Sequence, residues 1–219
     1  MCPRKSAEQC ICLDRDMGKT LDYLGKISGA VHWEGRSTMN KCLIVVDYQK
    51  DFVTGALGFE VAKTLDDGIA ARIWEYHGNG DTVLFTLDTH DANYPTTYEG
   101  LHLPIPHCIK GTEGHTLFGK TGKAKKDSDL VFEKGTFGSE KLFAYLKNTP
   151  FESIEFCGVV SDICVISNVV LARTAQPETE VLVNSALIAS NNADHHQAAL
   201  TVMESLQVHV INGKGEKNG

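Results

Sequence analysis

The sequence predicts a single α/β domain with three layers, in which helices cover both faces of a mostly parallel central sheet. Apolar runs of strand length alternate with helix-like segments from residue 41 to residue 211. Such alternation is typical of a parallel sheet that is covered on both faces. The chain has 219 residues, which is enough for one domain of this kind with a sizeable core.

Composition and charge exclude several classes of protein. The formal net charge of −7 argues against a surface that binds nucleic acid. The seven cysteines are odd in number and scattered, and Cys42 and Cys157 fall in predicted core strands, so a disulfide scaffold is not expected. No apolar run approaches the ~20 residues that span a bilayer, and the N-terminus lacks an apolar stretch of the signal-peptide type. We therefore expect a soluble, cytoplasmic protein that binds neither membranes nor nucleic acids.

The domain boundaries follow from the periodicity. Residues 1–38 show little of it and are expected to form a loosely ordered N-terminal extension, residues 39–213 the domain itself, and residues 214–219 a C-terminal tail. Cys10 and Cys12 form a C-x-C pair, which without further paired ligands is weak support for a metal site. Met39 stands directly before the first strand and is an alternative start of the protein, a choice that the sequence leaves open.

The first predicted strand is the apolar run KCLIVVD, residues 41–47, and it ends in a carboxylate. A continuous apolar run is typical of a central strand that is buried on both faces. Open α/β sheets bind their ligands at the carboxyl ends of their strands, so Asp47 is a candidate site residue; the alternative is a turn or capping residue. Asp51 is expected to be a loop or capping acid, and Phe52 to point its ring toward the same edge.

The next two elements bring more polar groups to that edge. Residues 65–77 predict an amphipathic helix, which the sequence GNG at 78–80 closes. Residues 82–87 predict the second buried strand, and this strand runs directly into Asp88 and His90. The two side chains are two residues apart, so both can face one cavity if the strand has ended.

An irregular segment rich in proline, glycine and histidine follows at residues 91–116. Loops of this length inside a compact domain are functional or disordered. Carboxylate and imidazole groups are ligands that suit a divalent metal such as Zn, Fe or Mn. The alternative is that these loop histidines are exposed and unconnected. Together with the preceding strand end, the segment supplies six candidate ligands: Asp88, His90, Glu99, His102, His107 and His115.

Two further strands end in residues that carry chemistry. Residues 130–133 predict a third strand followed by Lys134, by default a solvated surface residue, and residues 139–146 a short helix capped by Ser139. Residues 156–172, FCGVVSDICVISNVVLA, begin as a buried strand, turn at Ser161 and continue as an apolar helix. Residues 180–183, 194–206 and 208–211 then predict a strand, a helix and the last strand of the sheet.

Cys164 falls at the expected start of the helix that follows this buried strand. Unpaired backbone N–H groups and the helix dipole favour an anion there. We therefore expect the thiol to lose its proton more readily than a free cysteine, whose pKa is about 8.5. Cys164 is our candidate nucleophile, and the alternative is a buried cysteine that only packs.

Asp47, Lys134 and Cys164 all belong to the carboxyl edge of one predicted sheet, and their chemistry is complementary. Asp47 is placed to take the thiol proton. The Lys134 cation would stabilise the thiolate and hold the carboxylate. The backbone N–H groups of Val160 and Cys164 are candidates for an oxyanion hole, in which one donor contributes roughly 3–4 kcal/mol to barrier lowering.

The sequence resembles a known family over residues 41–211. The segments VVDYQKDF, FEKGTF and GVVSDICV look like the Asp-Lys-Cys triad of the isochorismatase-like cysteine hydrolases. Within that superfamily, DTH at 88–90 and PIPHC at 104–108 resemble the metal-binding loop of the nicotinamidase (pyrazinamidase) branch. The resemblance implies that Asp47 is the general base, Lys134 the charge stabiliser and Cys164 the nucleophile. It also implies a cis peptide bond at Val159–Val160.

The resemblance further implies one bound divalent metal ion that positions the substrate. Asp88, His90 and His107 match its ligands directly. A fourth ligand in the family is either a histidine or a glutamate. The position of the family's histidine corresponds to Thr96, which cannot bind the metal. The position of its glutamate corresponds to Glu99, and His102 is the alternative to Glu99. The metal would hold the pyridine nitrogen and so orient the substrate. Phe52 and Phe137 are candidates to sandwich the flat ring.

The function implied is hydrolysis of nicotinamide to nicotinate and ammonia through a cysteine thioester, for NAD salvage. One alternative is a metal-free cysteine amidohydrolase of the same superfamily, acting on carbamoyl or ureido substrates. A vinyl-ether hydrolase of the isochorismate type is disfavoured because some members of that branch lack the cysteine. A non-catalytic binding module has no need for all three triad residues. By analogy with the family we expect a homo-oligomer.

Overall fold

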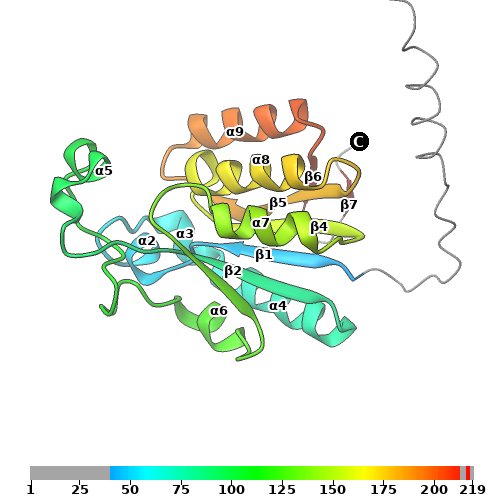
Figure 1. The fold of residues 1–219 in the computed structure, drawn as a ribbon, viewed down its shortest axis with the longest axis horizontal. Coiled ribbons are helices and arrows are strands. Elements are labelled where there is room, and N and C mark those ends of the chain that lie inside the picture. Colours follow the sequence, from blue (N-terminus) through cyan, green and yellow to red (C-terminus); the bar gives the residue numbers. More distant parts are fainter. Residues whose placement is uncertain (1–39, 213–215, 218–219) are drawn as a thin grey trace, which may run out of the picture. The chain divides into compact units, whose positions relative to one another are not determined.

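A mostly parallel sheet forms the middle layer of the fold (Figure 1). The computed structural model describes residues 40–212 and 216–217; the predicted N-terminal extension, Cys10, Cys12, Met39 and most of the predicted tail lie outside the described residues. Neighbouring strands are parallel from β3 to β6, and β7 pairs antiparallel with β6. The strand order is β3-β2-β1-β4-β5-β6-β7, with bounds β1 (Cys42–Val46), β2 (Thr82–Asp88), β3 (Leu130–Lys134), β4 (Ser153–Val159), β5 (Glu180–Ala189), β6 (His209–Asn212) and β7 (Glu216–Lys217).

Helices cover both faces of this sheet, which confirms the predicted α/β fold class. One face carries α7 (Glu140–Asn148), α8 (Ile166–Ala175) and α9 (Ala193–Ser205), and the other carries α4 (Asp66–Asn79) and α6 (Gly119–Ala124) (Figure 1). Shorter helical segments lie in the connections: α2 (Lys50–Val53), α3 (Glu60–Thr64), η1 (Tyr94–Thr96), α5 (Tyr98–His102) and η2 (Ser161–Val165). In the described part of the chain, no helix is both long and apolar enough to cross a membrane.

The alternation of side chains along β1 explains its continuous apolar sequence. Cys42, Ile44 and Val46 point into the core that α7, α8 and α9 cover, whereas Leu43 and Val45 point into the core on the α4 side. All five side chains are completely buried. A strand buried on both faces cannot alternate polar with apolar residues, and the apolar run at residues 41–47 therefore predicted its central place correctly.

Helix α4 and strand β5 both extend beyond the ends that the sequence predicted. Helix α4 continues through Gly78 and Asn79 and ends at Gly80, which adopts the left-handed conformation with φ 78°. Strand β5 continues to Ala189 instead of ending near Val183. The next residue, Asn184, is polar, but its amide donates to the buried carboxylate of Glu155 at 3.2 Å, so the strand keeps a satisfied polar side chain inside the sheet.

The strand order brings four sequence-distant residues to one edge of the sheet. Asp47 follows β1 directly, Asp88 ends β2, Lys134 ends β3, and Cys164 lies in the helical turn η2 after β4. These four strands are neighbours in the order β3-β2-β1-β4. Their carboxyl ends point to the side of the molecule on which α5 lies (Figure 1). This is the edge where open α/β sheets bind ligands.

Candidate active site and metal-ligand cluster

The structure brings Asp47, Lys134 and Cys164 together. The ammonium nitrogen Nζ of Lys134 lies 2.6 Å from Asp47 Oδ2 and 3.6 Å from Cys164 Sγ. It also lies 3.3 Å from Oδ1 of Asp88. All of these residues are buried, and Asp47 has no exposed surface at all. Their convergence, which the sequence predicted from three separate strand ends, places an acid, an amine and a thiol within reach of one another.

The backbone and a neighbouring hydroxyl fix the Asp47 carboxylate. Asp47 has a φ of 47°, a left-handed conformation that non-glycine residues seldom adopt and that clusters at functional sites. The hydroxyl of Thr86, on the adjacent strand β2, donates to Asp47 Oδ1 at 2.7 Å. Because Oδ1 is held in this way, Oδ2 is the oxygen that faces Lys134. Thr86 was not among the residues that the sequence suggested.

Electrostatics correct one expectation about Cys164. Burial raises the pKa of its thiol well above the ordinary value, and Asp47 adds to the effect while Lys134 opposes it. Burial likewise raises the pKa of Asp47, while the charge of Lys134 and hydrogen bonds from Lys134 and Thr86 lower it. The expected fall in thiol pKa is therefore wrong for the resting site, because burial and the charge of Asp47 outweigh the charge of Lys134. A thiol that keeps its proton at rest requires a base.

A side chain of the following helix, Asn168, holds the turn that carries Cys164. The turn begins after a cis peptide bond at Val159–Val160, as the family resemblance implied. The buried Asn168 donates through Nδ2 to the Cys164 carbonyl at 2.8 Å and to the Phe137 carbonyl at 3.1 Å. Asn168 thus ties the cysteine turn to the loop after β3. The role of the Val160 and Cys164 N–H groups as an oxyanion hole stays a prediction.

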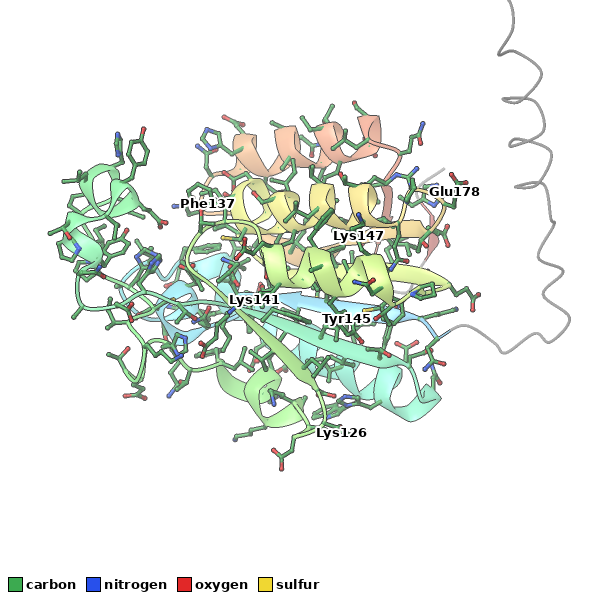
Figure 2. The ribbon with its side chains drawn as sticks, viewed as in Figure 1. Lys126, Phe137, Lys141, Tyr145, Lys147 and Glu178 are labelled. Carbon is green, nitrogen blue, oxygen red and sulfur yellow. The ribbon has the colours of Figure 1, made fainter. Side chains whose placement is uncertain are left out.

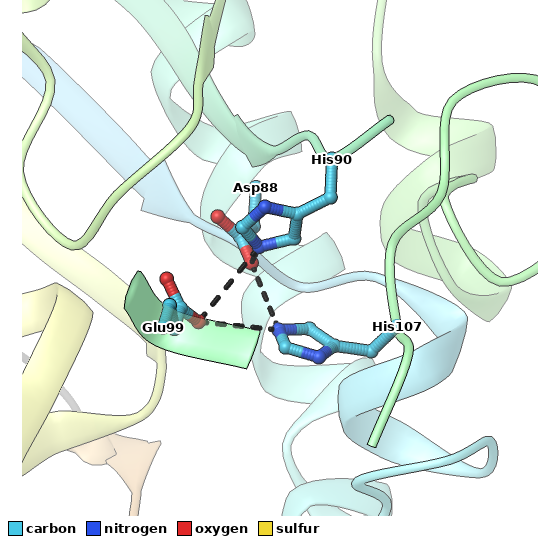
Figure 3. Close-up of side chains that lie close together, drawn as sticks. All are labelled: Asp88, His90, Glu99 and His107. Atoms are coloured by element: carbon cyan, nitrogen blue, oxygen red, sulfur yellow. Dashed lines mark hydrogen bonds and ion pairs between the residues drawn. The ribbon is translucent and has the colours of Figure 1, made fainter. Parts of the chain in front are cut away.

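Asp88, which contacts Lys134, belongs to a cluster of four side chains with metal-ligand chemistry. Figure 3 shows the four side chains. One ligand atom from each of Asp88, His90, Glu99 and His107 lies within 4.8 Å of every other. Asp88 Oδ2 is 3.0 Å from His90 Nε2 and 3.3 Å from His107 Nε2. Glu99 Oε1 is 3.8 Å from His90 Nε2 and 3.7 Å from His107 Nε2.

The cluster fits a small divalent cation. Ligands about 2.1 Å from a tetrahedral ion lie roughly 3.4 Å from one another, and the four distances between neighbouring ligand atoms, from 3.0 to 3.8 Å, bracket that value. The Nδ1 atom of His107 lies 2.8 Å from the Ile105 carbonyl, which fixes the tautomer that presents Nε2 to the cluster. Asp88 turns Oδ2 to the cluster and Oδ1 to Lys134, so one carboxylate joins the cluster to the triad.

The choice between Glu99 and His102 as the fourth member is resolved by position. Glu99 lies in the cluster, whereas the exposed His102 places its Nδ1 atom 2.8 Å from the Tyr98 carbonyl and packs its ring on Tyr98. His115 also lies outside the cluster, with Nε2 2.8 Å from the hydroxyl of Thr89. Helix α5 therefore turns Glu99 inward and His102 outward.

The two candidate ring-binding residues differ in their surroundings. Phe52 is buried and packs against His107, with 5.4 Å between ring centroids. Phe137 is 46% exposed and lies in the loop that Asn168 ties to the cysteine turn (Figure 2). Each aromatic ring thus belongs to a segment attached to the site, and a sandwich of the two around a substrate ring stays a prediction.

Gln49 and Asp51, in the connection that follows β1, bind backbone groups of residues in or next to the cluster. The side chain of Gln49 accepts from the Asp88 N–H at 2.8 Å and donates to the Asp88 carbonyl at 2.9 Å. Asp51 accepts from the Cys108 N–H at 2.7 Å and so holds the residue next to His107. The role of Gln49 was missed, and that of Asp51 was expected only as a loop or capping acid. Their position within VVDYQKDF, directly after the strand-end aspartate, was the available signal.

A phosphate-binding pattern elsewhere in the sequence has no such function in the fold. Residues 114–121, GHTLFGKT, match the spacing G-x-x-x-x-G-K-T. The carboxylate of Asp66 accepts from the N–H groups of Lys120 at 2.8 Å and Thr121 at 2.9 Å. An acidic side chain therefore occupies the N–H groups that a phosphate would need, so the pattern does not form a phosphate site here.

Comparison with known proteins shows what this chain is similar to. The sequence model of the isochorismatase domain matches residues 41–214. A curated relative from Bacillus subtilis (strain 168), described as an uncharacterized isochorismatase family protein PncA, is 31% identical over 174 residues, 74% of this chain and 93% of that protein.

Solved structures have the same architecture. The crystal structure of nicotinamidase/pyrazinamidase PncA from Bacillus subtilis is 30% identical, with a TM-score of 0.71 over 78% of this chain and 99% of that one. The pyrazinamidase of Pyrococcus horikoshii in complex with zinc has a TM-score of 0.70 at 21% identity, over 79% of this chain and 99% of that one. At the latter identity the likeness concerns the fold.

Proposed function

This chain belongs to the isochorismatase family, and we propose that it is a nicotinamidase, which hydrolyses nicotinamide to nicotinate and ammonia for NAD salvage. It is a hydrolase that acts on linear amide C–N bonds, as the related nicotinamidases do. The observation that carries the proposal is that Asp47, Lys134 and Cys164 converge directly beside the Asp-His-Glu-His cluster. Association into a homo-oligomer stays a prediction.

The first half of the proposed reaction forms a thioester. The Cys164 thiol passes its proton to Asp47 as sulfur attacks the amide carbon, because burial keeps the thiol protonated at rest. The N–H groups of Val160 and Cys164 would receive the oxyanion of the tetrahedral intermediate. Asp47 then gives the proton to the amide nitrogen, the C–N bond breaks, and ammonia leaves.

The second half hydrolyses the thioester. Asp47, again ionised, takes a proton from a water molecule that attacks the same carbon. The C–S bond breaks, nicotinate leaves, and the proton returns to sulfur. Burial alone would lower the pKa of Lys134, but Asp47, Cys164 and Asp88 raise it, so Lys134 remains a cation that stabilises the carboxylate of Asp47 through both halves.

Asp88, His90, Glu99 and His107 are the residues that would hold a divalent metal ion, with Zn, Fe and Mn all compatible with two imidazoles and two carboxylates. When bound, the metal would supply a Lewis acid that coordinates the pyridine nitrogen and so orients the ring. The Pyrococcus horikoshii pyrazinamidase, a protein of the same fold, has been solved in complex with zinc, which supports a metal ion as part of the proposal. Phe52, packed on His107, is placed to contact the flat face of the same ring.

A panel of amides tests the proposed function. We expect ammonia release from nicotinamide and pyrazinamide, and little from benzamide, which lacks a ring nitrogen. Removing the metal with a chelator should raise KM for the two pyridine-type amides by at least about tenfold, ~1.4 kcal/mol of binding, and zinc should restore it. Preference for a ureido or carbamoyl substrate would contradict the nicotinamidase proposal. If elemental analysis shows that fully active protein contains no metal, the metal ion is not part of the proposed function.

Thr86 supplies a prediction about pH. Its hydrogen bond lowers the pKa of Asp47, so Thr86→Val should raise that pKa further. Since the base must be ionised, kcat/KM is lost as the pH falls through this pKa, and the acidic limb of the profile should move to higher pH. Thr86→Ser keeps the hydroxyl and should keep the wild-type limb. Identical acidic limbs for the valine and serine variants would contradict the role.

A further inference from the structure

The fourth member of the cluster comes from a short helix that buries few of its side chains. Glu99 lies on α5, which has only five residues and projects away from the sheet (Figure 1). Its neighbours Tyr98 and Leu101 are 81% and 70% exposed. The Glu99 side chain, in contrast, is only 20% exposed. Burial of an apolar face therefore does not explain how α5 keeps Glu99 turned toward His90 and His107.

Tyr94 is the residue that joins α5 to the two histidines. Its ring is completely buried and packs on His90 and His107, with centroid distances of 4.6 and 5.0 Å. Its hydroxyl donates to the carbonyl of Leu103, just beyond the end of α5, at 2.9 Å. At the other end of α5, its carbonyl accepts from the hydroxyl of Thr97 at 2.8 Å. Tyr94 thus contacts both imidazoles through its ring, and both ends of α5 through its hydroxyl and its carbonyl.

Gly100 makes the close approach between α5 and Tyr94 possible. Its N–H donates to the Thr97 hydroxyl oxygen at 3.0 Å, and the residue is buried. A Cβ atom at position 100 would lie 1.9 Å from the Tyr94 carbonyl oxygen and 2.8 Å from its carbonyl carbon. Both are backbone atoms, so neither can swing aside as the end of a side chain would. Any larger residue must move α5 away from Tyr94.

We propose that Gly100 is a positioning residue for the metal site: its missing side chain lets α5 pack on the Tyr94 carbonyl, and this contact places Glu99 as the fourth ligand. The inference rests on the metal site of the proposed function. Because Glu99 is the residue directly before Gly100, a displacement of α5 carries its carboxylate away from the histidines. Asp88, His90 and His107 come from other segments and would keep their places.

Zinc affinity of the full chain, measured by competition with a chromophoric chelator, tests this. Gly100→Ala should weaken zinc binding about 10- to 100-fold, the range typical for residues that orient ligands, and so should Glu99→Gln. The double variant should bind no more weakly than Glu99→Gln alone, since both changes remove the same ligand. Gly78→Ala is the matched control: a Cβ there meets nothing within 4 Å, and wild-type affinity is expected.

A Co²⁺ spectrum and a second variant test the same positioning role. The visible spectrum of the Co²⁺-loaded Gly100→Ala protein should match that of Glu99→Gln and differ from wild type. Should Gly100→Ala fail to fold, Thr97→Val, which removes the hydroxyl between Tyr94 and Gly100, should give the same non-additive loss with Glu99→Gln. Either of two results would overturn the inference alone. One is wild-type zinc affinity in Gly100→Ala, or in Thr97→Val where Gly100→Ala does not fold. The other is a fully additive loss in the double variant. A wild-type protein that binds no zinc would overturn the metal site as well.

Discussion

Replacing Cys164 by alanine should lower kcat/KM for amide hydrolysis by at least about 10⁴-fold while leaving the fold intact. The sulfur is the atom that would form the thioester, and alanine offers no replacement. Lys134 and Asp47 would still form their ion pair at 2.6 Å, so the site should not collapse. Ammonia release measures the turnover, and circular dichroism with urea unfolding measures the fold.

Cys157 is the matched control for this variant. It is also a free, completely buried cysteine, and it lies on β4, the strand that leads to the cysteine turn. It points into the core on the α4 side instead of toward Lys134. Cys157→Ala should therefore keep wild-type turnover at a modest cost in stability. An alanine variant at 164 that still turns over, or equal losses in both variants, would refute Cys164 as the nucleophile.

The sequence predicted the triad because strand ends are visible in it. Asp47 directly follows an apolar run and Lys134 directly follows the predicted strand at residues 130–133, and parallel strands bring their carboxyl ends to one edge. Thr86 could not be found in this way. It lies inside a strand with the polarity and β-propensity of an ordinary strand residue, and its value to the site comes only from the register that sets Thr86 beside Val46, next to Asp47. Register is a property of the folded sheet.

Glu155 shows a second limit of the sequence. The segment SIEFCGVV, residues 153–160, was predicted to be a buried strand, and Ser153–Val159 does form one, but it carries a carboxylate that is only 1% exposed. Its partner Arg72 is 83 residues away on α4 and donates to it through Nε at 3.0 Å. Tyr76 donates to the same carboxylate at 2.9 Å, and Asn184 at 3.2 Å. Hydrophobic periodicity reports burial but cannot identify distant partners of a buried charge.

This network carries the largest stability effect that we expect. Glu155→Leu should lower the free energy of unfolding by about 3–5 kcal/mol, because it leaves a mostly buried guanidinium without its counter-charge. The side chain of Arg72 is only 16% exposed, and its second carboxylate contact, with Glu75, is at the surface. Urea unfolding measures the change. As a control, Glu60→Gln breaks an exposed ion pair with Lys63 and should cost less than about 1 kcal/mol.

The double variant Glu155→Leu/Arg72→Met separates the cost of a broken pair from the value of the pair itself. If the loss comes from an uncompensated buried charge, removing both charges should recover most of it, because buried pairs can be replaced by apolar side chains at little cost. Equal destabilisation in the single and double variants would contradict that cause. Glu155 lies near the amino end of β4 and faces α4, away from the carboxyl edge. The double variant should therefore keep its amidase activity, which would show that the charge inside the sheet serves the fold and the charges at its edge serve the chemistry.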